Sequence, residues 1–232
     1  MKSLKAQHLS SDELLHSLLE YTTKIAEERE LDKLLVLMND LGKEILVCDR
    51  CTLWLVEQDD VWTKVAHGLE ELRMPKSRGL VGECVTSGLS IIVNDPYEDP
   101  RFNQEVDQIT GYHTNSILVL PLFKNDGALL GVYQAINKSI QGEGFTKEDV
   151  QRLQLIATFS SKSLESALLY KEVEQTQMEL VYMLGEAGES RSKETGNHVK
   201  RVGEYSFILA EALGLSADES QLIRLAAPLH DL

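Results

Sequence analysis

The fold class is decided by one stretch of sequence, Gly131-Val132-Tyr133-Gln134-Ala135-Ile136-Asn137-Lys138. Its β-branched and aromatic side chains favour an extended strand. Another apolar run at 117–122 precedes it, and Lys124-Asn125-Asp126-Gly127 lies between the two. Because an Asp-Gly pair tolerates the positive φ of a tight turn, these runs predict a β-hairpin. Similar short runs occur at 52–56, 62–66 and 91–93, so together with the hairpin they predict a mostly antiparallel sheet of five or six strands.

Helical patterns lie on both sides of the predicted strands. A capping box from Ser10 to Glu13 opens the first pattern, and a second covers 31–45 as a separate helix or a bent continuation. The third begins with the box from Thr146 to Asp149 and meets no interruption before Gly185. Strands flanked by helices in this order predict an α+β fold.

The second half of the long third helix carries a regular stripe of side chains. Its members recur at alternating steps of four and three residues, the a/d spacing of a coiled coil: Leu169, Val173, Thr176, Leu180, Met183 and Ala187. This spacing predicts a parallel homodimer seam, and we expect a homodimer through the N-terminal and linker helices. An amphipathic helix packed on its own domain is the alternative, which Thr176 at a seam position keeps open.

Composition excludes several classes of partner. The chain has 232 residues, with 23 Lys and Arg against 37 Asp and Glu, so its formal net charge is −14. It has no long cluster of Lys or Arg, and we therefore expect no binding to nucleic acid or to membranes. No apolar run approaches the roughly 18–20 residues of a membrane span and no signal sequence is recognisable, which predicts a cytoplasmic protein.

The three cysteines predict no disulfide framework and no zinc site. Cys48 and Cys51 have the spacing of half a zinc site, but no second Cys pair or His pair near them in the sequence completes it. We expect both to be small buried residues around the start of a strand, with Cys84 also a reduced thiol.

Residues 31–165 resemble a GAF domain, most closely those of cyclic-nucleotide phosphodiesterases and cyclases. The stretches that carry the resemblance are 79–83, 94–103, 107–114, 120–121 and 131–138. The family signature N-K…F-x₃-D-E falls on Asn137, Lys138, Phe145 and Asp149, with Val150 in place of its last Glu. The resemblance implies a GAF fold that binds a small ligand, with cAMP or cGMP as the expected nucleotide.

The resemblance also implies a ligand pocket. Gly79 and Gly82 would flank a turn whose backbone approaches the ligand closely. The base-stacking position of many such pockets falls on Ala66, so the choice between cAMP and cGMP stays open. Lys138 and Asp149 are expected to form a salt bridge that closes the domain without touching the ligand. The implied pocket residues are Thr52, His67, Leu80, Val81, Asn103, Asp107, Thr110, Thr114 and Gln134.

The segment 189–232 resembles the start of an HD-GYP domain. Thr195-Gly196-Asn197-His198 matches its opening, and Leu229-His230-Asp231 matches its HD dyad. Glu194 and His198 stand four residues apart, so on a helix both side chains leave the same face and can reach one ion. The family implies a metal-dependent cyclic di-GMP phosphodiesterase, with iron or manganese held by Glu194, His198, His230 and Asp231.

Four segments follow from these patterns. We expect an N-terminal helix at 1–30, the GAF domain at 31–165, a linker helix at 146–188 and an all-α fragment of an HD-GYP domain at 189–232. The expected function is a sensory GAF domain that binds a cyclic nucleotide and regulates the attached phosphodiesterase. The HD-GYP pattern stops after the HD dyad, so we expect this 232-residue chain to be inactive. The alternative is a GAF dimerisation and interaction module without a nucleotide ligand; a GAF-type methionine sulfoxide reductase is disfavoured because Cys84 has no evident partner cysteine.

Overall fold

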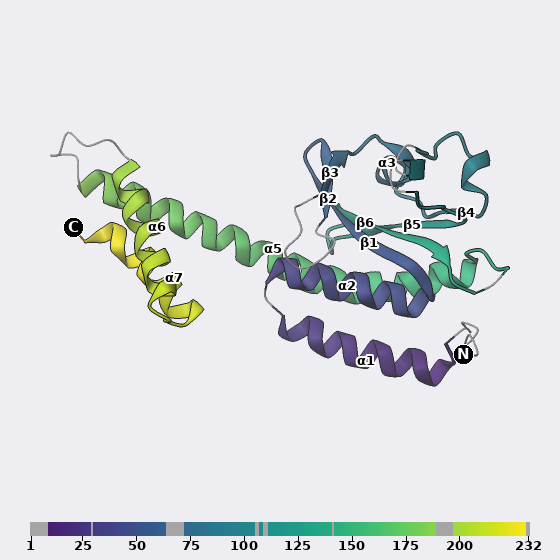
Figure 1. Cartoon of the computed structure of the whole chain (residues 1–232), viewed down its shortest axis with the longest axis horizontal. Coiled ribbons are helices and arrows are strands. Elements are labelled where there is room, and N and C mark those ends of the chain that lie inside the picture. The colour runs from purple at the N-terminus through teal and green to yellow at the C-terminus, as the bar shows by residue number, and fades with distance from the viewer. Residues whose placement is uncertain are drawn as a thin grey trace. The chain divides into compact units, whose positions relative to one another are not determined.

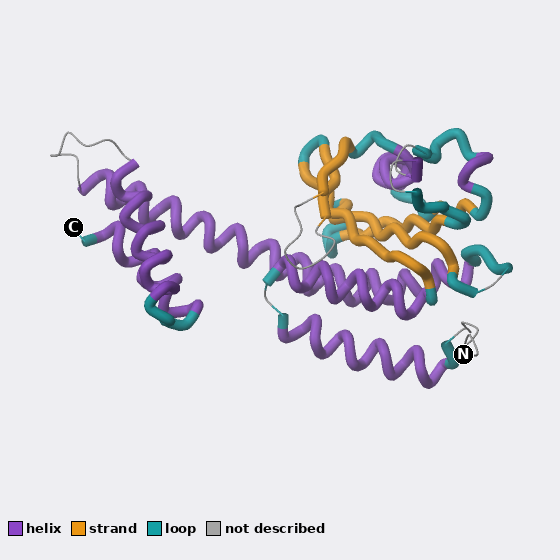
Figure 2. The backbone as a smooth tube through the Cα atoms, in the orientation of Figure 1, coloured by secondary structure: helices purple, strands orange, loops and turns teal. Residues whose placement is uncertain are grey.

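The structure is a computed structural model, and it describes residues 9–28, 30–63, 72–104, 107–108, 111–140, 142–188 and 197–230. The chain divides into two compact units, Met1–Leu168 and Leu169–Leu232. The first unit holds the sheet and the second is helical (Figure 1, Figure 2). The predicted α+β class with an antiparallel sheet is confirmed for the first unit.

The sheet has six antiparallel strands in the order β3-β2-β1-β6-β5-β4. The predicted hairpin joins β5 to β6, with Gly127 at φ +85° in its turn. Of the expected strand at 62–66, Trp62 and Thr63 belong to β2, which begins at Asp60, and 64–66 lie outside the described residues. β3 pairs with β2 and was not predicted. The strands are β1 Cys48–Glu57, β2 Asp60–Thr63, β3 Leu72–Pro75, β4 Ile91–Val93, β5 Ile117–Phe123 and β6 Leu129–Lys138.

Two separate helices precede the sheet. The capping box is present at the start of α1, Ser11–Glu27, where the Glu13 carboxylate accepts from the Ser10 backbone N–H at 2.8 Å. The backbone is extended at Glu28 and Glu30, so α2, Leu31–Leu46, is a new helix rather than a bent continuation. The two helices are joined by the Ser17 hydroxyl, which donates to Glu44 at 2.5 Å.

One face of the sheet packs against helices α2 and α5, Lys147–Gly188 (Figure 1). Successive residues of a strand point to opposite faces, and here the alternate positions Leu53 and Leu55 of β1 and Tyr133 of β6 lie in this core. Burial of Tyr133 is complete, and its hydroxyl donates to Ser160 of α5 at 3.0 Å. This bond satisfies a polar group that would otherwise be costly to bury.

The opposite face carries α3, Gly79–Ser87 (Figure 1). The expectation of a turn at Gly79 and Gly82 is wrong, because both residues belong to this helix. Gly79 has φ +68°, and a Cβ at Gly82 would lie 2.5 Å from the Ser77 carbonyl carbon. Gly82 is therefore explained by the close approach of the chain's own backbone.

The second unit consists of the end of α5 with α6, Asn197–Ala212, α7, Ala217–Ala226, and η3, Ala227–Leu229. A capping box begins α7, since Glu219 N–H donates to the Ser216 hydroxyl and the Ser216 N–H donates to the Glu219 carboxylate. Glu204 of α6 accepts from Tyr182 of α5 at 3.1 Å and from Arg224 of α7, which ties the three helices together. Helix α5 continues through Gly185, where a Cβ would lie 2.7 Å from the Pro228 carbonyl oxygen, so this glycine permits close packing and does not end the helix.

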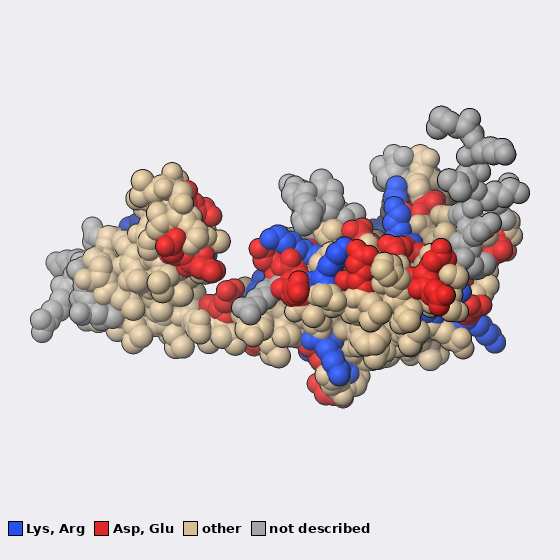
Figure 3. Space-filling view, turned by 90° about the horizontal axis from the view of Figure 1, so that it is seen from below, with Lys and Arg blue, Asp and Glu red and all other residues tan. Residues whose placement is uncertain are grey.

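Charged side chains are spread over the surface rather than gathered in one block. On the face seen in Figure 3, acidic and basic groups are intermixed. Lys24 with Glu20 at 2.7 Å and Lys33 with Glu30 at 2.6 Å are pairs of this kind. Within the described residues, no helix is both long and apolar enough to cross a membrane.

Candidate functional site

The candidate site lies on the face of the sheet that carries α3. This helix buries Leu80, Val81 and Cys84 against Val119 of β5 and Val132 of β6. Next to this covered part, β1 and β6 present side chains that are only half-buried: Thr52, Trp54 and Gln134. We call these three residues the floor; together they offer an aromatic surface and a few polar groups, which are the kinds of groups that line ligand sites.

The floor residues are positioned by the pairing of β1 with β6. Thr52 lies directly opposite Gln134 in the register, and Trp54 lies opposite Val132. Trp54 is thus a diagonal neighbour of Gln134, and its indole Nε1–H donates to Gln134 Oε1 at 3.0 Å. The central strands of the sheet therefore set the positions of the floor side chains.

A polar connection between β4 and β5 is tied together by Asp107. This carboxylate is buried and accepts from Thr114 N–H at 2.8 Å, from the Thr114 hydroxyl at 3.0 Å and from the Tyr97 hydroxyl at 2.8 Å. The bond to Asp107 raises the pKa of Tyr97 because it favours the protonated phenol. The Tyr97 ring also stacks on His113, with 4.9 Å between ring centroids. Both Asp107 oxygens are occupied by these contacts, which hold the connection in shape.

Asn137 holds the end of the same connection. It adopts φ +57°, and its Oδ1 accepts from the N–H groups of Asn115 at 2.6 Å and Ser116 at 3.3 Å. Its Nδ2 donates to the His113 carbonyl at 2.8 Å and to the Tyr112 hydroxyl at 3.0 Å. One side chain thus completes four hydrogen bonds for a segment without regular structure of its own.

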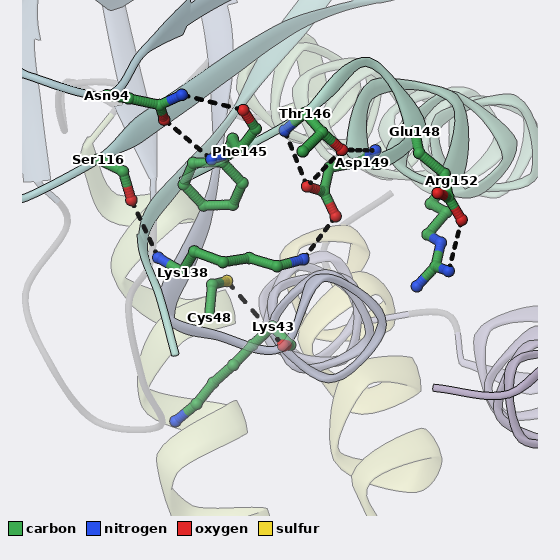
Figure 4. Close-up of polar contacts among 10 residues, drawn as sticks. All are labelled: Lys43, Cys48, Asn94, Ser116, Lys138, Phe145, Thr146, Glu148, Asp149 and Arg152. Carbon is green, nitrogen blue, oxygen red and sulfur yellow. Dashed lines mark hydrogen bonds and ion pairs between the residues drawn. The ribbon is translucent and has the colours of Figure 1, made fainter. Parts of the chain in front are cut away.

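The predicted salt bridge between Lys138 and Asp149 is present and buried (Figure 4). Lys138 Nζ lies 2.5 Å from Asp149 Oδ1, and the two side chains are 0% and 2% exposed. Asp149 Oδ2 accepts from the backbone N–H of Thr146 at 2.9 Å and from its hydroxyl at 3.1 Å. The pair therefore joins the end of β6 to the first turn of α5, as expected of a contact that closes the domain.

Phe145 and Asn94 complete this cluster. The Asn94 side chain accepts from Phe145 N–H at 2.8 Å and donates to the Phe145 carbonyl at 3.1 Å (Figure 4). The Phe145 ring is buried, with Lys138 Nζ 6.0 Å from its centroid. Asn94 follows β4, so these bonds connect the start of the polar connection to the start of α5.

The sequence of the first unit matches a known family. The family model of the GAF domain matches residues 31–164, more than half of the chain. The chain belongs to the GAF domain family. A curated relative is the dual 3',5'-cyclic-AMP and -GMP phosphodiesterase 11A of Takifugu rubripes, which is 32% identical over 177 residues. This match covers 63% of the chain and 20% of the relative's length.

Solved structures share the GAF fold at low sequence identity. The free methionine-R-sulfoxide reductase of Neisseria meningitidis is 21% identical, with a TM-score of 0.57 over 72% of this chain and 99% of that one. The GAF domain of a phosphoenolpyruvate-protein phosphotransferase from Coxiella burnetii is 19% identical, with a TM-score of 0.59 over 68% and 96%. Likenesses at this identity show the fold alone.

The GAF domain brings some of the predicted pocket residues together. Thr52 and Gln134 lie side by side on the floor, while Leu80 and Val81 are buried in α3. Asp107 and Thr114 bind each other, and Asn103 is half-buried in the connection. His67 and Thr110 lie outside the described residues.

Sequence reasoning missed Trp54 as a member of the floor. Its place in the strand at 52–56, two residues after Thr52, was the available signal, since alternate strand residues share a face.

The cysteines of the GAF domain are free and buried, as predicted. Burial raises the pKa of Cys48 to about 12 and that of Cys84 to about 12, and it raises the pKa of Cys51 well above its usual value. A thiol with so high a pKa has almost no thiolate at neutral pH, and thiolate is the reactive form. These cysteines are therefore packing residues of the GAF core.

The GAF domain has a depression away from the floor. It is open, has a volume of about 370 Å³ and lies between α1 and the carboxyl end of α2. Burial and the negative charge of Glu44 raise the pKa of Tyr21, which lines it, to about 12. The other lining residues are Asp40, Lys43, Glu44, Val47, Cys48 and Ser139.

Two of the four predicted metal ligands are described in the second unit. The rings of His198 and His230 lie near each other, with 6.3 Å between centroids. His230 Nδ1 is 2.8 Å from the Ala227 carbonyl, and because a carbonyl oxygen only accepts, Nδ1 is the donor in this contact. Glu194 and Asp231 lie outside the described residues. Within the described residues, no group of three or more His, Cys, Asp or Glu side chains is placed to hold a metal ion.

Proposed function

We propose that this GAF domain is a sensor that binds a cyclic nucleotide, cAMP or cGMP, on the floor beside α3. The observation that carries the proposal is the 32% identity over 177 residues to a phosphodiesterase named for both nucleotides. The chemistry of the floor supports it. A nucleotide needs apolar surface for its base and hydrogen-bonding groups for its edge and phosphate, and the floor offers the indole of Trp54, the hydroxyl of Thr52 and the amide of Gln134.

The contacts around the floor offer a route by which binding would reach α5. Asn137 holds the polar connection next to the site, and the adjacent Lys138 holds α5 through Asp149. A nucleotide that prefers one arrangement of the connection would thereby bias the start of the long helix. Regulation of this kind requires different affinities for two arrangements, because equal affinities shift nothing.

The regulated partner in this proposal is an HD-GYP metal-dependent phosphodiesterase that acts on cyclic di-GMP and whose start is the segment 189–232. The two nearby imidazoles of His198 and His230 fit such a centre, and the Ala227 carbonyl orients the second ring as an outer hydrogen bond does at metal sites. Glu194 and Asp231 would supply the carboxylates. A bound first-row metal would supply a polarised phosphoryl oxygen and an activated water.

Titration calorimetry of the purified chain with cAMP and cGMP tests the proposed ligand. We expect saturable heat with at least one nucleotide at concentrations up to about 100 μM, and a higher melting temperature at saturation because the ligand binds only folded protein. Thr52→Val keeps the side-chain shape but removes the hydroxyl, and we expect it to weaken binding about three- to tenfold. Thr22→Val, which makes the same change on α1, is the matched control. Absence of heat and of any thermal shift with both nucleotides would contradict the proposal.

A second candidate function, dimerisation without a nucleotide, is favoured by the exposed stripe on α5. Leu169, Val173, Leu180 and Met183 are 50–60% exposed, which is unusual for apolar side chains at a/d spacing. Leu155 and Phe159 lie two heptads before Leu169 and Val173 and are also exposed. A second copy of the chain, paired along this stripe, would bury all of them.

Light scattering on size-exclusion chromatography tests the proposed dimer. We expect a dimer for the wild-type chain and a monomer for Leu180→Asp, because a charge in an apolar seam lacks a partner. Gln175→Asp adds the same charge at an exposed position off the stripe and should stay dimeric. If Leu180→Asp has the same mass as the wild-type chain, the stripe is not the interface.

A further inference from the structure

The hydrogen bond between Trp54 and Gln134 settles which end of the Gln134 amide is available. An indole N–H can only donate, so the atom that it meets must be the amide oxygen, Oε1, at 3.0 Å. In other glutamines the oxygen and nitrogen ends can exchange by rotation, but rotation here would place two donors against each other. The amide nitrogen, with its two hydrogens, is therefore the end left for another partner.

The described neighbours of Gln134 do not accept a hydrogen bond from its amide nitrogen, Nε2. Thr52 and Val119 flank Gln134 directly on β1 and β5. Among the described residues, the Gln134 side-chain amide makes one hydrogen bond, which it accepts from Trp54. Gln134 is half-buried, so a ligand on the floor could reach its nitrogen. The floor thus presents a fixed donor at Gln134 and a hydroxyl at Thr52 that can adapt as donor or acceptor.

We propose that Trp54 is a positioning residue that holds Gln134 as a hydrogen-bond donor, so that the site selects the base carrying an acceptor at this point. Resting on the proposed function, this inference names the preferred ligand as cGMP. Both bases carry an acceptor at N7, but at C6 guanine has the acceptor O6 where adenine has an amino group, so the two differ for a donor that faces C6. A donor that faces the adenine amino group stays unpaired, and an unpaired buried donor costs binding.

The measured quantity is the ratio of the cAMP to the cGMP dissociation constant, obtained by calorimetry for each variant. We expect a ratio of about ten or more for the wild-type chain. Gln134→Glu keeps an oxygen for Trp54 but replaces the donor with an acceptor, so the ratio should fall at least tenfold. Trp54→Phe releases the amide to rotate, and the ratio should move toward one. If Gln134→Glu fails to fold, Gln134→Met, which has no donor, should also bring the ratio near one.

Trp62→Phe is the matched control, because it removes an indole from the core on the other face of the sheet. It should leave the wild-type ratio unchanged even if stability falls, and a merely structural role for Trp54 predicts the same for Trp54→Phe.

Three results would overturn the inference, and they are distinguishable. An unchanged ratio in Gln134→Glu and Trp54→Phe rejects the positioning role while leaving nucleotide binding intact. An equal weakening of both nucleotides in Gln134→Glu means that the amide contacts the phosphate, which they share, rather than the base. Absence of binding of either nucleotide to the wild-type chain rejects the proposed function and this inference with it.

Discussion

Replacing Lys138 with methionine is expected to lower the free energy of unfolding by about 3–5 kcal/mol, a large fraction of the stability of a domain. The variant leaves the Asp149 carboxylate, whose side chain is 2% exposed, without its charged partner. Buried charge is strongly disfavoured unless paired, and among the described residues Thr146 supplies the remaining hydrogen bonds to the Asp149 carboxylate. Urea unfolding followed by tryptophan fluorescence measures the loss, because both tryptophans, Trp54 and Trp62, lie in the GAF domain.

Two controls separate the buried pair from a general effect of losing a lysine. Lys24→Met breaks an exposed pair with Glu20, where both side chains are 50% exposed, and we expect a change below about 0.5 kcal/mol. The double variant Lys138→Met with Asp149→Asn removes both charges and should recover a substantial part of the loss. If Lys138→Met costs no more than Lys24→Met, the pair does not close the domain.

Asn137→Ala is expected to destabilise the GAF domain by about 3 kcal/mol. The variant removes the acceptor for Asn115 and Ser116 and the donor for His113, and it leaves a residue with a Cβ at φ +57°. Each lost hydrogen bond costs about 1 kcal/mol, and alanine tolerates the left-handed conformation less well than asparagine. The same urea experiment provides the measurement.

Asn137→Gly separates these two causes. Glycine adopts φ +57° without strain but makes none of the four side-chain hydrogen bonds. We expect it to be about 1 kcal/mol more stable than Asn137→Ala and still clearly less stable than the wild-type chain. Equal stability of the glycine variant and the wild-type chain would mean that the side-chain bonds contribute nothing.

Local sequence signals predicted the features that depend on few neighbouring residues. The capping boxes at Ser10 and Thr146 and the turn at Gly127 are set within four residues, and all three are present. The pair of Lys138 with Asp149 was implied by family resemblance, since the two residues are 11 positions apart and nothing local joins them.

Features that depend on contacts between residues far apart in the chain could not be predicted from local sequence patterns. Gly82 suggested a turn near a ligand, but its reason is the backbone at Ser77 that folds against α3. Asp107 and Thr114 were each implied as a ligand contact, and their hydrogen bonds to each other were not predicted. The bond of Trp54 to Gln134 joins residues 80 positions apart and depends on the register of β1 with β6.

The signature residues Asn137 and Lys138 are adjacent on β6 but act on different parts of the GAF domain. The Asn137 side chain holds the polar connection beside the floor, and the Lys138 side chain reaches Asp149 in α5. This division gives each signature residue a structural role of its own in the GAF domain. Lys138→Met and Asn137→Ala should therefore destabilise the domain through separate contacts. If the connection and α5 are uncoupled, the two losses in free energy of unfolding add within about 0.5 kcal/mol in the double variant.

The central claim, that a cyclic nucleotide binds on the floor beside α3, is tested most directly by a crystal structure of the chain grown with saturating cGMP. Our account predicts nucleotide density over Thr52, Trp54 and Gln134, with the guanine C6 edge toward the Gln134 amide nitrogen. Nucleotide density elsewhere on the chain, with the floor free of ligand, would contradict it.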